Sequence, residues 1–303
     1  MFGGFSHSVI GASHETSGLV CQDHSAYEVN EHYSVAVIAD GHGSKKYFRS
    51  HLGSQFAVES ALETLRHFYA DPEGFEQNFP KNHKMILKNM KKQIIANWNA
   101  HVQEHLANNP VRLAEMQKFT KEEFKEIPPE SYYGTTLVVA VSGRGFQFGL
   151  QIGDGSLVAI YEDGVPVMPM VYDESAPANM TASMCNSNAA SMFNSFYVEN
   201  KKAIAMYASS DGLYTSFSNE DDFLEYHLII TSQLDNLEAF AQSVKKNLTK
   251  RSHYGTEDDI SLACICDLDL LQEKVPMLKA EVADRKAHAA ERKAQRLAAL
   301  RNT

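Results

Sequence analysis

Five aspartates stand beside expected strands, and their spacing could gather them at one site. Asp40, Asp154 and Asp211 each come just after an apolar or alternating run, and each is followed by glycine. Asp258 comes just before another such run, and Asp23 is a fifth candidate. The start of one antiparallel strand lies beside the end of its neighbour, so these acids can converge on one edge of a sheet. Crowded carboxylates repel one another unless cations neutralise them.

Oxygen ligands of this kind indicate a particular class of metal ion. They suit hard cations such as Mg²⁺ or Mn²⁺, whereas zinc prefers cysteine and histidine. Two such ions held close together can bridge a hydroxide and orient a phosphate for in-line attack. The acid set therefore suggests hydrolysis of a phosphate ester. A further pair, Asp163 and Gly164, lies between two short β-rich runs and predicts only a hairpin turn.

The element that must position Asp40 is a strand over residues 33–39. The run is apolar on both faces, which indicates a buried strand. A carboxylate at the end of a buried strand costs free energy unless it is paired, and a bound cation is one such partner. Gly41 and Gly43 let the chain turn tightly and let a ligand approach the backbone. An Asp-Gly pair alone is most often a plain turn, so the other acids carry the prediction.

Other patterns predict the elements around this strand. Residues 8–24 indicate two strands joined by a turn, the second ending near Asp23. Helical spacing of apolar residues predicts one helix from Ser44, which could cap it, and another over residues 80–108. Residues 169–200 show no period and predict a loop. Further strands are expected over 133–141, 146–152, 157–161, 203–209 and 260–266, and a helical stretch over 219–249.

Composition and charge exclude several classes of function. The chain has 303 residues, 44% of them hydrophobic and 22% charged, with a formal net charge of −10. This is ordinary globular composition, and an acidic chain is a poor non-specific partner for nucleic acid. The N-terminus lacks a signal-peptide pattern, and no apolar run approaches the roughly 20 residues that span a bilayer. We therefore expect a cytoplasmic protein without nucleic-acid or membrane partners. We also expect its cysteines to be reduced, since their spacing fits no zinc pattern.

The tail after Pro276 has a composition of its own. It is rich in alanine, and it holds seven Lys or Arg residues against three acids. The pattern predicts an exposed basic helix. Such a helix is either a solvated extension or an arm for an acidic partner or a second copy of the chain.

Five short motifs follow one another along the chain in a distinctive order. They are Asp40-Gly41-His42-Gly43, Gly134-Thr135-Thr136, Gly153-Asp154-Gly155, Ser210-Asp211-Gly212 and Gly255-Thr256-Glu257-Asp258-Asp259. In this order, and at roughly these distances, they resemble the metal-dependent protein serine/threonine phosphatases of type 2C. The resemblance covers about residues 8–268. The form of residues 153–155, with Cys21-Gln22-Asp23 near the start, resembles the bacterial branch.

The resemblance implies an α+β fold and a division of the chain. The family fold is a four-layer α-β-β-α sandwich of two antiparallel sheets flanked by helices, with a two-metal centre at one end. Residues 1–270 would form this phosphatase domain, and residues 169–200 would be its variable flap beside the active site. Residues 271–303 would be a basic helical C-terminal extension.

The resemblance also implies roles for the acids. By similarity, Asp40 would bridge two Mn²⁺ or Mg²⁺ ions, and the carbonyl of Gly41 would bind one of them. Asp211 and Asp258 would bind the other ion. Asp154 with Asp211 would hold a weaker third ion.

Catalysis by this family implies further roles. Asp23 would order metal-bound water from the second layer of the site, and His42 would be the general acid that protonates the leaving alkoxide. A metal-bridging hydroxide would attack phosphorus directly, without a phosphoenzyme. The substrate would be phosphoserine or phosphothreonine in a phosphorylated protein.

Two positions depart from the family pattern. The family often has glutamate next to the aspartate placed here at Asp23, whereas this chain has Gln22, which can orient water but carries no charge. The family also often has an arginine a few residues earlier that holds the substrate phosphate, and residues 15–22 contain none. His14, Lys45 and Lys46 are candidates to replace it.

Three readings of the function follow from these residues. The first is a metal-dependent protein phosphatase, and the second is a phosphatase-like module that binds a partner with weak or no catalysis. The third is a two-metal phosphoesterase with a small-molecule substrate. The set of carboxylates favours an enzyme, because a binding module has no reason to keep costly acids together. Gln22 and the missing arginine favour the binding module slightly.

Overall fold

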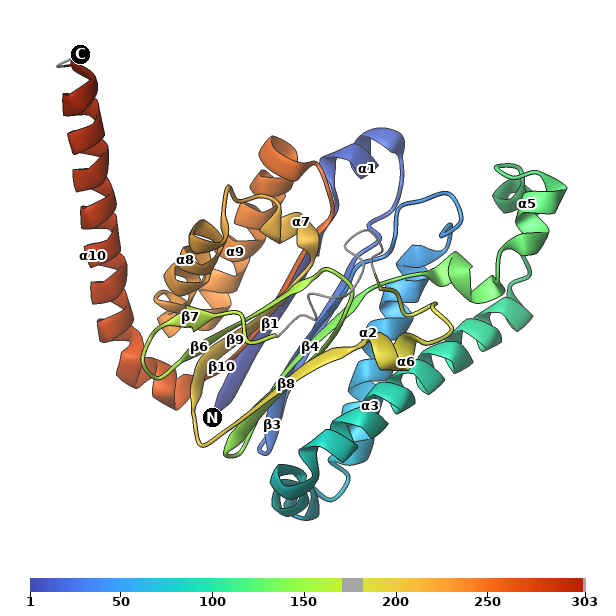
Figure 1. Cartoon of the computed structure of the whole chain (residues 1–303), viewed down its shortest axis with the longest axis horizontal. Coiled ribbons are helices and arrows are strands. Elements are labelled where there is room, and N and C mark those ends of the chain that lie inside the picture. The colour runs from blue at the N-terminus through green and yellow to red at the C-terminus, as the bar shows by residue number, and fades with distance from the viewer. Residues whose placement is uncertain (171–181, 302–303) are drawn as a thin grey trace.

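The computed structural model describes residues 1–170 and 182–301, and within them the chain forms two five-stranded antiparallel sheets (Figure 1). The first sheet contains, in spatial order, β1 (Phe2–Val9), β10 (Ile260–Asp267), β9 (Ala203–Ser209), β6 (Ser156–Tyr161) and β7 (Pro166–Val167). The second contains β2 (His24–Val29), β3 (Tyr33–Ala39), β4 (Leu137–Gly143), β5 (Phe146–Ile152) and β8 (Asn194–Glu199).

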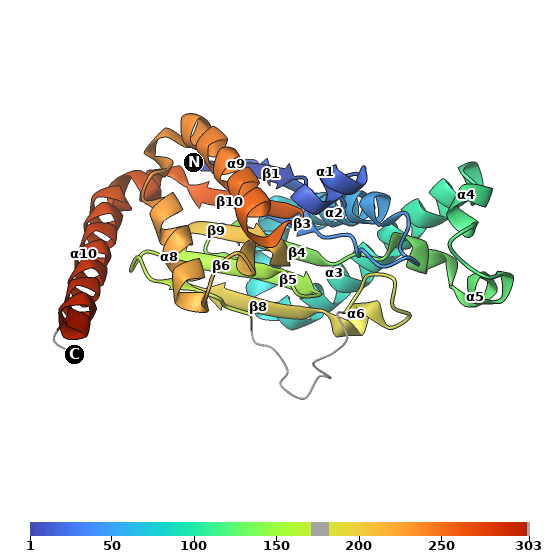
Figure 2. The same ribbon diagram turned by 90° about the horizontal axis from the view of Figure 1, so that it is seen from above.

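Helices cover the outer face of each sheet. Two long helices, α2 (Ser50–Phe68) and α3 (Pro72–Asn108), lie on the second sheet, while α8 (Glu220–Thr231) and α9 (Leu237–Arg251) lie on the first (Figures 1 and 2). The layers therefore run helix, sheet, sheet, helix, which confirms the predicted α+β four-layer sandwich. The connections contain shorter turns of helix: α1 (Ala12–Ser17), α4 (Leu113–Met116), α5 (Lys121–Glu126), η1 (Pro129–Tyr133), α6 (Ala189–Met192), α7 (Asp211–Tyr214), η2 (Leu234–Asn236) and η3 (Ser252–Thr256).

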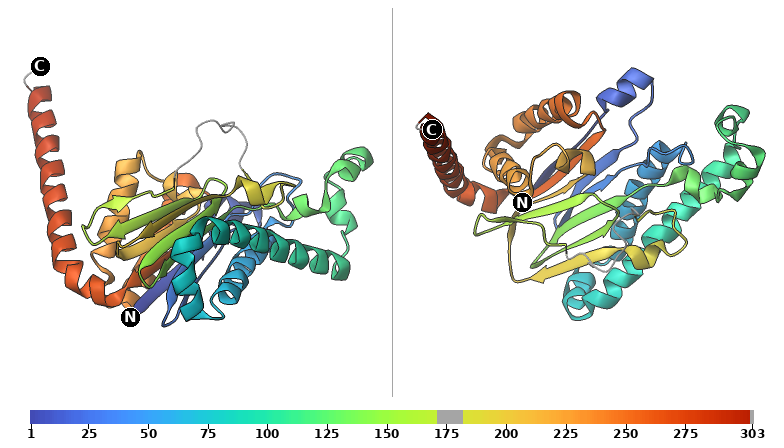
Figure 3. Two further views of the ribbon diagram at one scale, coloured as in Figure 1. Left: turned by 60° about the horizontal axis from the view of Figure 1, so that its bottom comes forward. Right: turned by 45° about the horizontal axis from the view of Figure 1, so that its top comes forward.

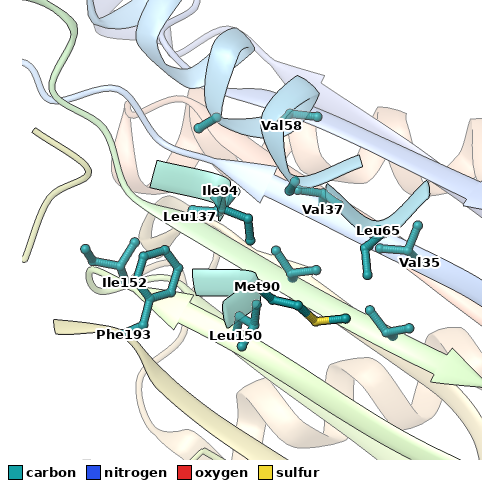
Figure 4. Packing of buried hydrophobic residues seen from close by; sticks show 14 of the residues in the cluster. Val35, Val37, Val58, Leu65, Met90, Ile94, Leu137, Leu150, Ile152 and Phe193 are labelled. Atoms are coloured by element: carbon teal, nitrogen blue, oxygen red, sulfur yellow. The ribbon is translucent and has the colours of Figure 1, made fainter. Parts of the chain in front are cut away.

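Strand β3 is buried along its whole length, as its apolar run from Val35 to Ala39 predicts. Val35 and Val37 pack toward the helices, where they meet residues of α2 and α3 such as Met90 (Figure 4). Ala36 and Ile38 face the other sheet. Each such buried aliphatic side chain contributes about 1.5–3 kcal/mol to folding, so β3 is firmly fixed up to the residue before Asp40.

Several expected elements differ from those observed. Residues 8–24 contain helix α1 rather than two strands, and β2 begins after Asp23 instead of ending there. Helix α1 buries none of its residues, so it leaves no apolar period in the sequence. Helix α2 begins at Ser50 after the cap position of Arg49, and Ser44 lies in the preceding turn.

The segment expected to be a loop over 169–200 is only partly irregular. Its last residues form β8, an edge strand paired with β5, in which Phe196 faces the space between the sheets. The strand is short and exposed on one side, so its alternation is weak in the sequence. Residues 171–181 of the expected flap lie outside the described residues. Residues 219–249 form α8 and α9 rather than one helical stretch.

The C-terminal helix α10 (Leu268–Arg301) belongs partly to the core. Leu271, Val275, Leu278 and Val282 are buried in the cluster between the first sheet and its helices. The expectation of an exposed tail after Pro276 is therefore wrong as far as Val282. Beyond this, the helix leads away from the sandwich (Figures 1 and 3).

Two expectations about the chain's chemistry can be compared with this fold. Among the described residues, no helix is both long and apolar enough to cross a membrane. All four cysteines are free thiols, and Cys264 and Cys266 are buried on one face of β10.

Candidate active site

Four of the predicted acids line one cavity at an end of the sandwich. The cavity has a volume of about 670 Å³, and its lining includes Asp40, Asp154, Asp211 and Asp258, together with Gly41. The structure therefore brings together residues that are as much as 218 positions apart, from Asp40 to Asp258.

Strand direction explains this convergence. Strands β3 and β5 flank β4 and run in the same direction, so Asp40 and Asp154 follow their ends at one edge. In the other sheet, Asp211 follows the end of β9, and Asp258 precedes the start of its antiparallel neighbour β10. The two sheet edges meet at the cavity, as the antiparallel rule predicts.

Backbone hydrogen bonds hold Asp40 in place from both sides. Its N–H donates to Thr136 Oγ1 at 3.1 Å, and its carbonyl accepts from the Thr136 N–H and the Thr135 hydroxyl, both at 2.8 Å. The next N–H, of Gly41, donates to the carbonyl of Gln22 at 3.2 Å. The two threonines of the second motif thus fix the strand end that carries the first.

Gly41 is a glycine because two carbonyl groups crowd its α-carbon. An added Cβ would lie 2.7 Å from the carbonyl oxygen of Gln22 and 2.8 Å from that of Ser50, closer than real Cβ contacts. Within the described part of the chain, no donor occupies the Gly41 carbonyl oxygen. That oxygen is therefore available as a ligand beside Asp40.

Burial and mutual repulsion perturb the carboxyls of this cavity. Burial raises the pKa of Asp40 well above its usual value, and the charges of Asp23 and Asp211 raise it further. Burial also raises the pKa of Asp211, with the charges of Asp154 and Asp258 adding to the effect. Charged carboxylates so close together need a cation to balance them.

Asp23 lies behind this cavity rather than on its wall. Its side chain is 5% exposed, and no described group forms a well-directed hydrogen bond with either carboxylate oxygen. Burial and the charge of Asp259 raise the pKa of Asp23 to about 8, although the hydroxyls of Ser210 and Ser261 lie close enough to lower it in part. A buried carboxyl without a partner is costly. Ordered water at a metal centre would supply the missing hydrogen bonds to the two oxygens of Asp23.

The donor set fits a hard cation bound in an open site. Among the described residues, no group of three or more His, Cys, Asp or Glu side chains is placed to hold a metal ion by itself. Magnesium typically binds through one or two carboxylates and keeps several waters, so it does not require such a group. The oxygen donors and the free carbonyl of Gly41 fit Mg²⁺ or Mn²⁺ better than zinc.

His42 lines the same cavity. Its backbone N–H donates to the carbonyl of Gly134 at 3.1 Å, and its ring lies against Tyr47 with a centroid distance of 4.7 Å. Burial lowers the pKa of His42, the nearby charge of Asp154 partly opposes this, and Lys46 lowers it further. The fold therefore fixes the orientation of the imidazole on the wall of the site.

A second histidine is held by an aspartate that the sequence did not single out. His14 Nδ1 lies 3.0 Å from Oδ1 of Asp259, whose carboxylate also accepts the N–H groups of Gly11 and Gln22, each at 2.6 Å. An ionised carboxylate only accepts hydrogen bonds, so Nδ1 donates the proton here. This leaves Nε2 as the free nitrogen of a histidine that lines the cavity.

The family model for protein phosphatase 2C matches residues 10–250 of the sequence. The chain belongs to the protein phosphatase 2C family. The resemblance read from the motifs is confirmed, and the chain is assigned to a family of serine/threonine phosphatase enzymes. A comparison with curated proteins finds no matching relative.

Solved phosphatase structures share the fold of this family member at low sequence identity. Stp1, a serine/threonine phosphatase from Staphylococcus aureus, is 14% identical with a TM-score of 0.54, covering 88% of this chain and 95% of its own. PppA of Pseudomonas aeruginosa is 16% identical with a TM-score of 0.53, covering 88% and 97%. The catalytic domain of PstP, solved with 2 manganese ions, is 14% identical with a TM-score of 0.50, covering 88% and 97%.

Only some of the candidate phosphate-binding residues of this phosphatase 2C chain line the cavity. Lys45 pairs with Glu123 at 3.1 Å and does not line the cavity. Lys46 lines it, with its ammonium 4.7 Å from the ring centre of Tyr47. His14 and Lys46 are thus the candidates that face the acids, and a phosphate-binding role for Lys45 stays a prediction.

The wall of the phosphatase cavity also contains residues that sequence reasoning missed. Ser183 and Asn186 come from the segment expected to be the flap. The N–H of Thr135 donates to Ser183 Oγ at 3.2 Å, and the N–H of Ser183 donates to Asn186 Oδ1 at 2.7 Å. No local pattern marks these residues, and the expected proximity of the flap to the site was the only signal available.

Proposed function

We propose that this chain is a metal-dependent protein phosphatase that hydrolyses phosphoserine and phosphothreonine. One observation carries the proposal: four aspartates from four strand ends line one cavity. Burial and the charges of neighbouring carboxylates raise the pKa values of Asp40, Asp211 and Asp258. The match to the phosphatase family supports the same reaction.

The residues present suit Mn²⁺ or Mg²⁺. Asp40 and the carbonyl of Gly41 would hold one ion, and Asp211 and Asp258 the second, with Asp40 between the two. Asp154 with Asp211 would hold a weaker third. The manganese ions in the related structure of PstP support this assignment. When bound, the ions neutralise the phosphate and activate the attacking water.

The side chains around the acids supply the remaining functions. His42 would give a proton to the leaving oxygen of the serine or threonine, because its ring lies on the cavity wall against Tyr47. Asp23 would accept hydrogen bonds from water behind the metal centre through its two unpaired oxygens.

His14 would hold the substrate phosphate in place of the family's usual arginine. Its Nδ1 is bound to Asp259, so Nε2 is directed by a fixed partner rather than by a flexible stem. Toward a phosphate oxygen, Nε2 would act as a hydrogen-bond donor, and hydrogen bonds to an ionised phosphate are stronger than neutral ones. Lys46 on the same wall would add a positive charge.

The second candidate is a phosphatase-like binding module, and the position of Gln22 favours it. Its side-chain amide donates to Ser50 Oγ at 2.8 Å, so the residue that departs from the family pattern is tied to α2. Purified protein assayed on an aryl phosphate with Mn²⁺, with and without chelator, separates the two. The enzyme hydrolyses the substrate only with metal, and Asp211→Asn abolishes turnover. Absence of metal-dependent turnover, or full activity in Asp211→Asn, contradicts the proposal.

A further inference from the structure

A second cavity lies at the end of the sandwich opposite the acids. Its volume is about 460 Å³, within the range of small-molecule sites. It is lined by the end of β4 with Ser142, and by the following turn with Arg144. The connection between β8 and β9, including Lys201 and Lys202, completes it. Because β4 starts at the acid end and finishes here, the two cavities are separated by the length of the sheets.

A polar row runs across three strands beside this cavity, and two of its residues, Ser142 and Gln147, form the floor. Ser34 of β3 pairs in register with Ser142 of β4, and Ser142 pairs with Gln147 of β5. The row continues the face of Ala36 and Ile38, which is otherwise the apolar layer between the sheets. Three adjacent polar residues are therefore placed where apolar ones would pack.

Two atoms of this row have no partner. Gln147 is 3% exposed and Ser34 is fully buried, yet neither Gln147 Oε1 nor Ser34 Oγ has a hydrogen bond to any described group. A buried polar atom left without a partner is destabilising, whereas an apolar replacement of similar shape is not. Gln147 lines the cavity, so a bound molecule would contact this residue, although its unpaired Oε1 atom is itself buried below the surface.

The mouth of the cavity carries positive charge. Arg144 donates through Nε to the carbonyl of Glu31 at 3.1 Å, but its guanidinium forms no ion pair with any described acid, and neither does Lys202. Lys201 is paired with Asp163 at 3.3 Å. Two acids also line the cavity, Glu162 and Asp267. The Oδ1 atom of Asp267 is occupied by the N–H groups at the start of α10, at 3.1 Å.

We propose that this cavity binds a small organic phosphate, such as a nucleoside or sugar monophosphate. Arg144 and Lys202 bind the phosphate at the mouth, where a guanidinium offers paired donors to phosphate oxygens. The rest of the ligand then lies over the floor, against Gln147. The site is independent of the catalytic proposal, because no residue lining it lines the acid cavity.

Calorimetric titration of the full-length protein tests this site. Adenosine 5′-monophosphate and ribose 5-phosphate are titrated in the presence of EDTA, so that neither turnover nor a metal-bound phosphate at the acids contributes heat. We expect saturable binding of at least one of them at one site. Inorganic phosphate should bind much more weakly, because it would contact only the residues at the mouth. The comparison of the two organic phosphates distinguishes recognition of a base from recognition of a sugar.

Variants locate the binding. Arg144→Ala combined with Lys202→Ala is expected to weaken binding by about tenfold or more, as loss of charge-assisted hydrogen bonds does. Gln147→Leu weakens it without unfolding the protein, because it removes a buried acceptor that lacks a partner. Lys250→Ala, an exposed lysine on α9, and Asp211→Asn both leave binding unchanged. No saturable binding of either organic phosphate, binding lost in Asp211→Asn, or binding unaffected by the double variant overturns the proposal.

Discussion

His14 and Asp259 form a fixed pair on the wall of the acid cavity, with 3.0 Å between Nδ1 and Oδ1. Asp259 is 3% exposed and is itself held by two backbone N–H groups, so the carboxylate cannot turn away. Asp258, the preceding residue, faces the cavity as a candidate metal ligand. The two adjacent acids just before β10 thus have different roles: Asp258 is a candidate metal ligand, and Asp259 holds His14.

The first prediction concerns this pair. His14→Ala is expected to raise KM for a phosphopeptide by about tenfold or more, because it removes one charge-assisted hydrogen bond to phosphate. His14→Arg should recover much of the loss, since a guanidinium offers paired hydrogen-bond donors to phosphate oxygens. Steady-state kinetics with Mn²⁺ measure both, and His32→Ala, a histidine paired with Glu76 away from the site, is the matched control. Unchanged KM in His14→Ala would remove His14 from phosphate binding.

The sequence could predict the acid cavity but not the His14–Asp259 pair, for a physical reason. Asp40 and Asp211 stand where apolar strands end, so strand periodicity and the antiparallel rule already place them at one edge. Asp259 acquires its role only when residues 11, 14 and 22 close around it. That closure is tertiary and leaves no period in the sequence.

The same distinction explains what else could be predicted. The strand over 33–39 is buried on both faces, and its residues from Val35 to Ala39 are visible as an apolar run. Helix α1 buries no residue, and β8 is a short edge strand, so neither gives a strong pattern. The polar row of Ser34, Ser142 and Gln147 needs the register of three strands, which one sequence does not contain.

The second prediction concerns proton donation by His42. His42→Ala should slow hydrolysis of phosphoserine peptides by about 10²–10⁴-fold, and that of an aryl phosphate much less, because a basic alkoxide needs a proton and a phenolate does not. Rates on the two substrates with the same preparation and metal give the comparison. Equal losses on both substrates would show that His42 does not act as the acid.

The third prediction uses a buried ion pair outside the site. Arg49, 4% exposed, donates to both oxygens of Glu115 at 2.9 and 3.0 Å and to the Tyr133 hydroxyl at 2.9 Å. These contacts connect the start of α2 and helix α4 to Tyr133, the residue before Gly134. Glu115→Gln leaves the buried guanidinium without a counter-charge, so we expect a loss of about 3 kcal/mol in the free energy of unfolding at pH 7.

The pH dependence of this loss follows from the same pair. The hydrogen bond from Arg49 lowers the pKa of Glu115 from 4.5 to about 2. The pair therefore stabilises the fold fully above pH 4.5 and progressively less as the pH falls toward 2. Denaturant titrations between pH 3 and pH 7 should show that the difference in free energy of unfolding between wild type and Glu115→Gln becomes smaller in acid. Glu104→Gln, on the exposed face of α3, should have the same free energy of unfolding as wild type. A difference for Glu115→Gln that stays constant with pH would contradict the assignment.

The fourth prediction concerns where the folded domain ends. Leu271, Val275, Leu278 and Val282 are buried against the first sheet, although the family resemblance placed the domain boundary at residue 270. At about 1.5–3 kcal/mol for each side chain, removing all four costs about as much as the whole stability of a typical domain, roughly 5–15 kcal/mol. A chain of residues 1–270 is therefore expected to unfold or aggregate, whereas residues 1–287 should keep the wild-type melting temperature.

Thermal unfolding followed by circular dichroism, together with the metal-dependent assay, compares the two truncations. A second variant separates packing from length: Leu278→Asp in the full chain places a charge at a position with no exposed area. It should lower the melting temperature sharply, whereas Lys286→Asp, on the exposed part of α10, should not. A stable, active chain of residues 1–270 would return the boundary to the position that the family resemblance implied.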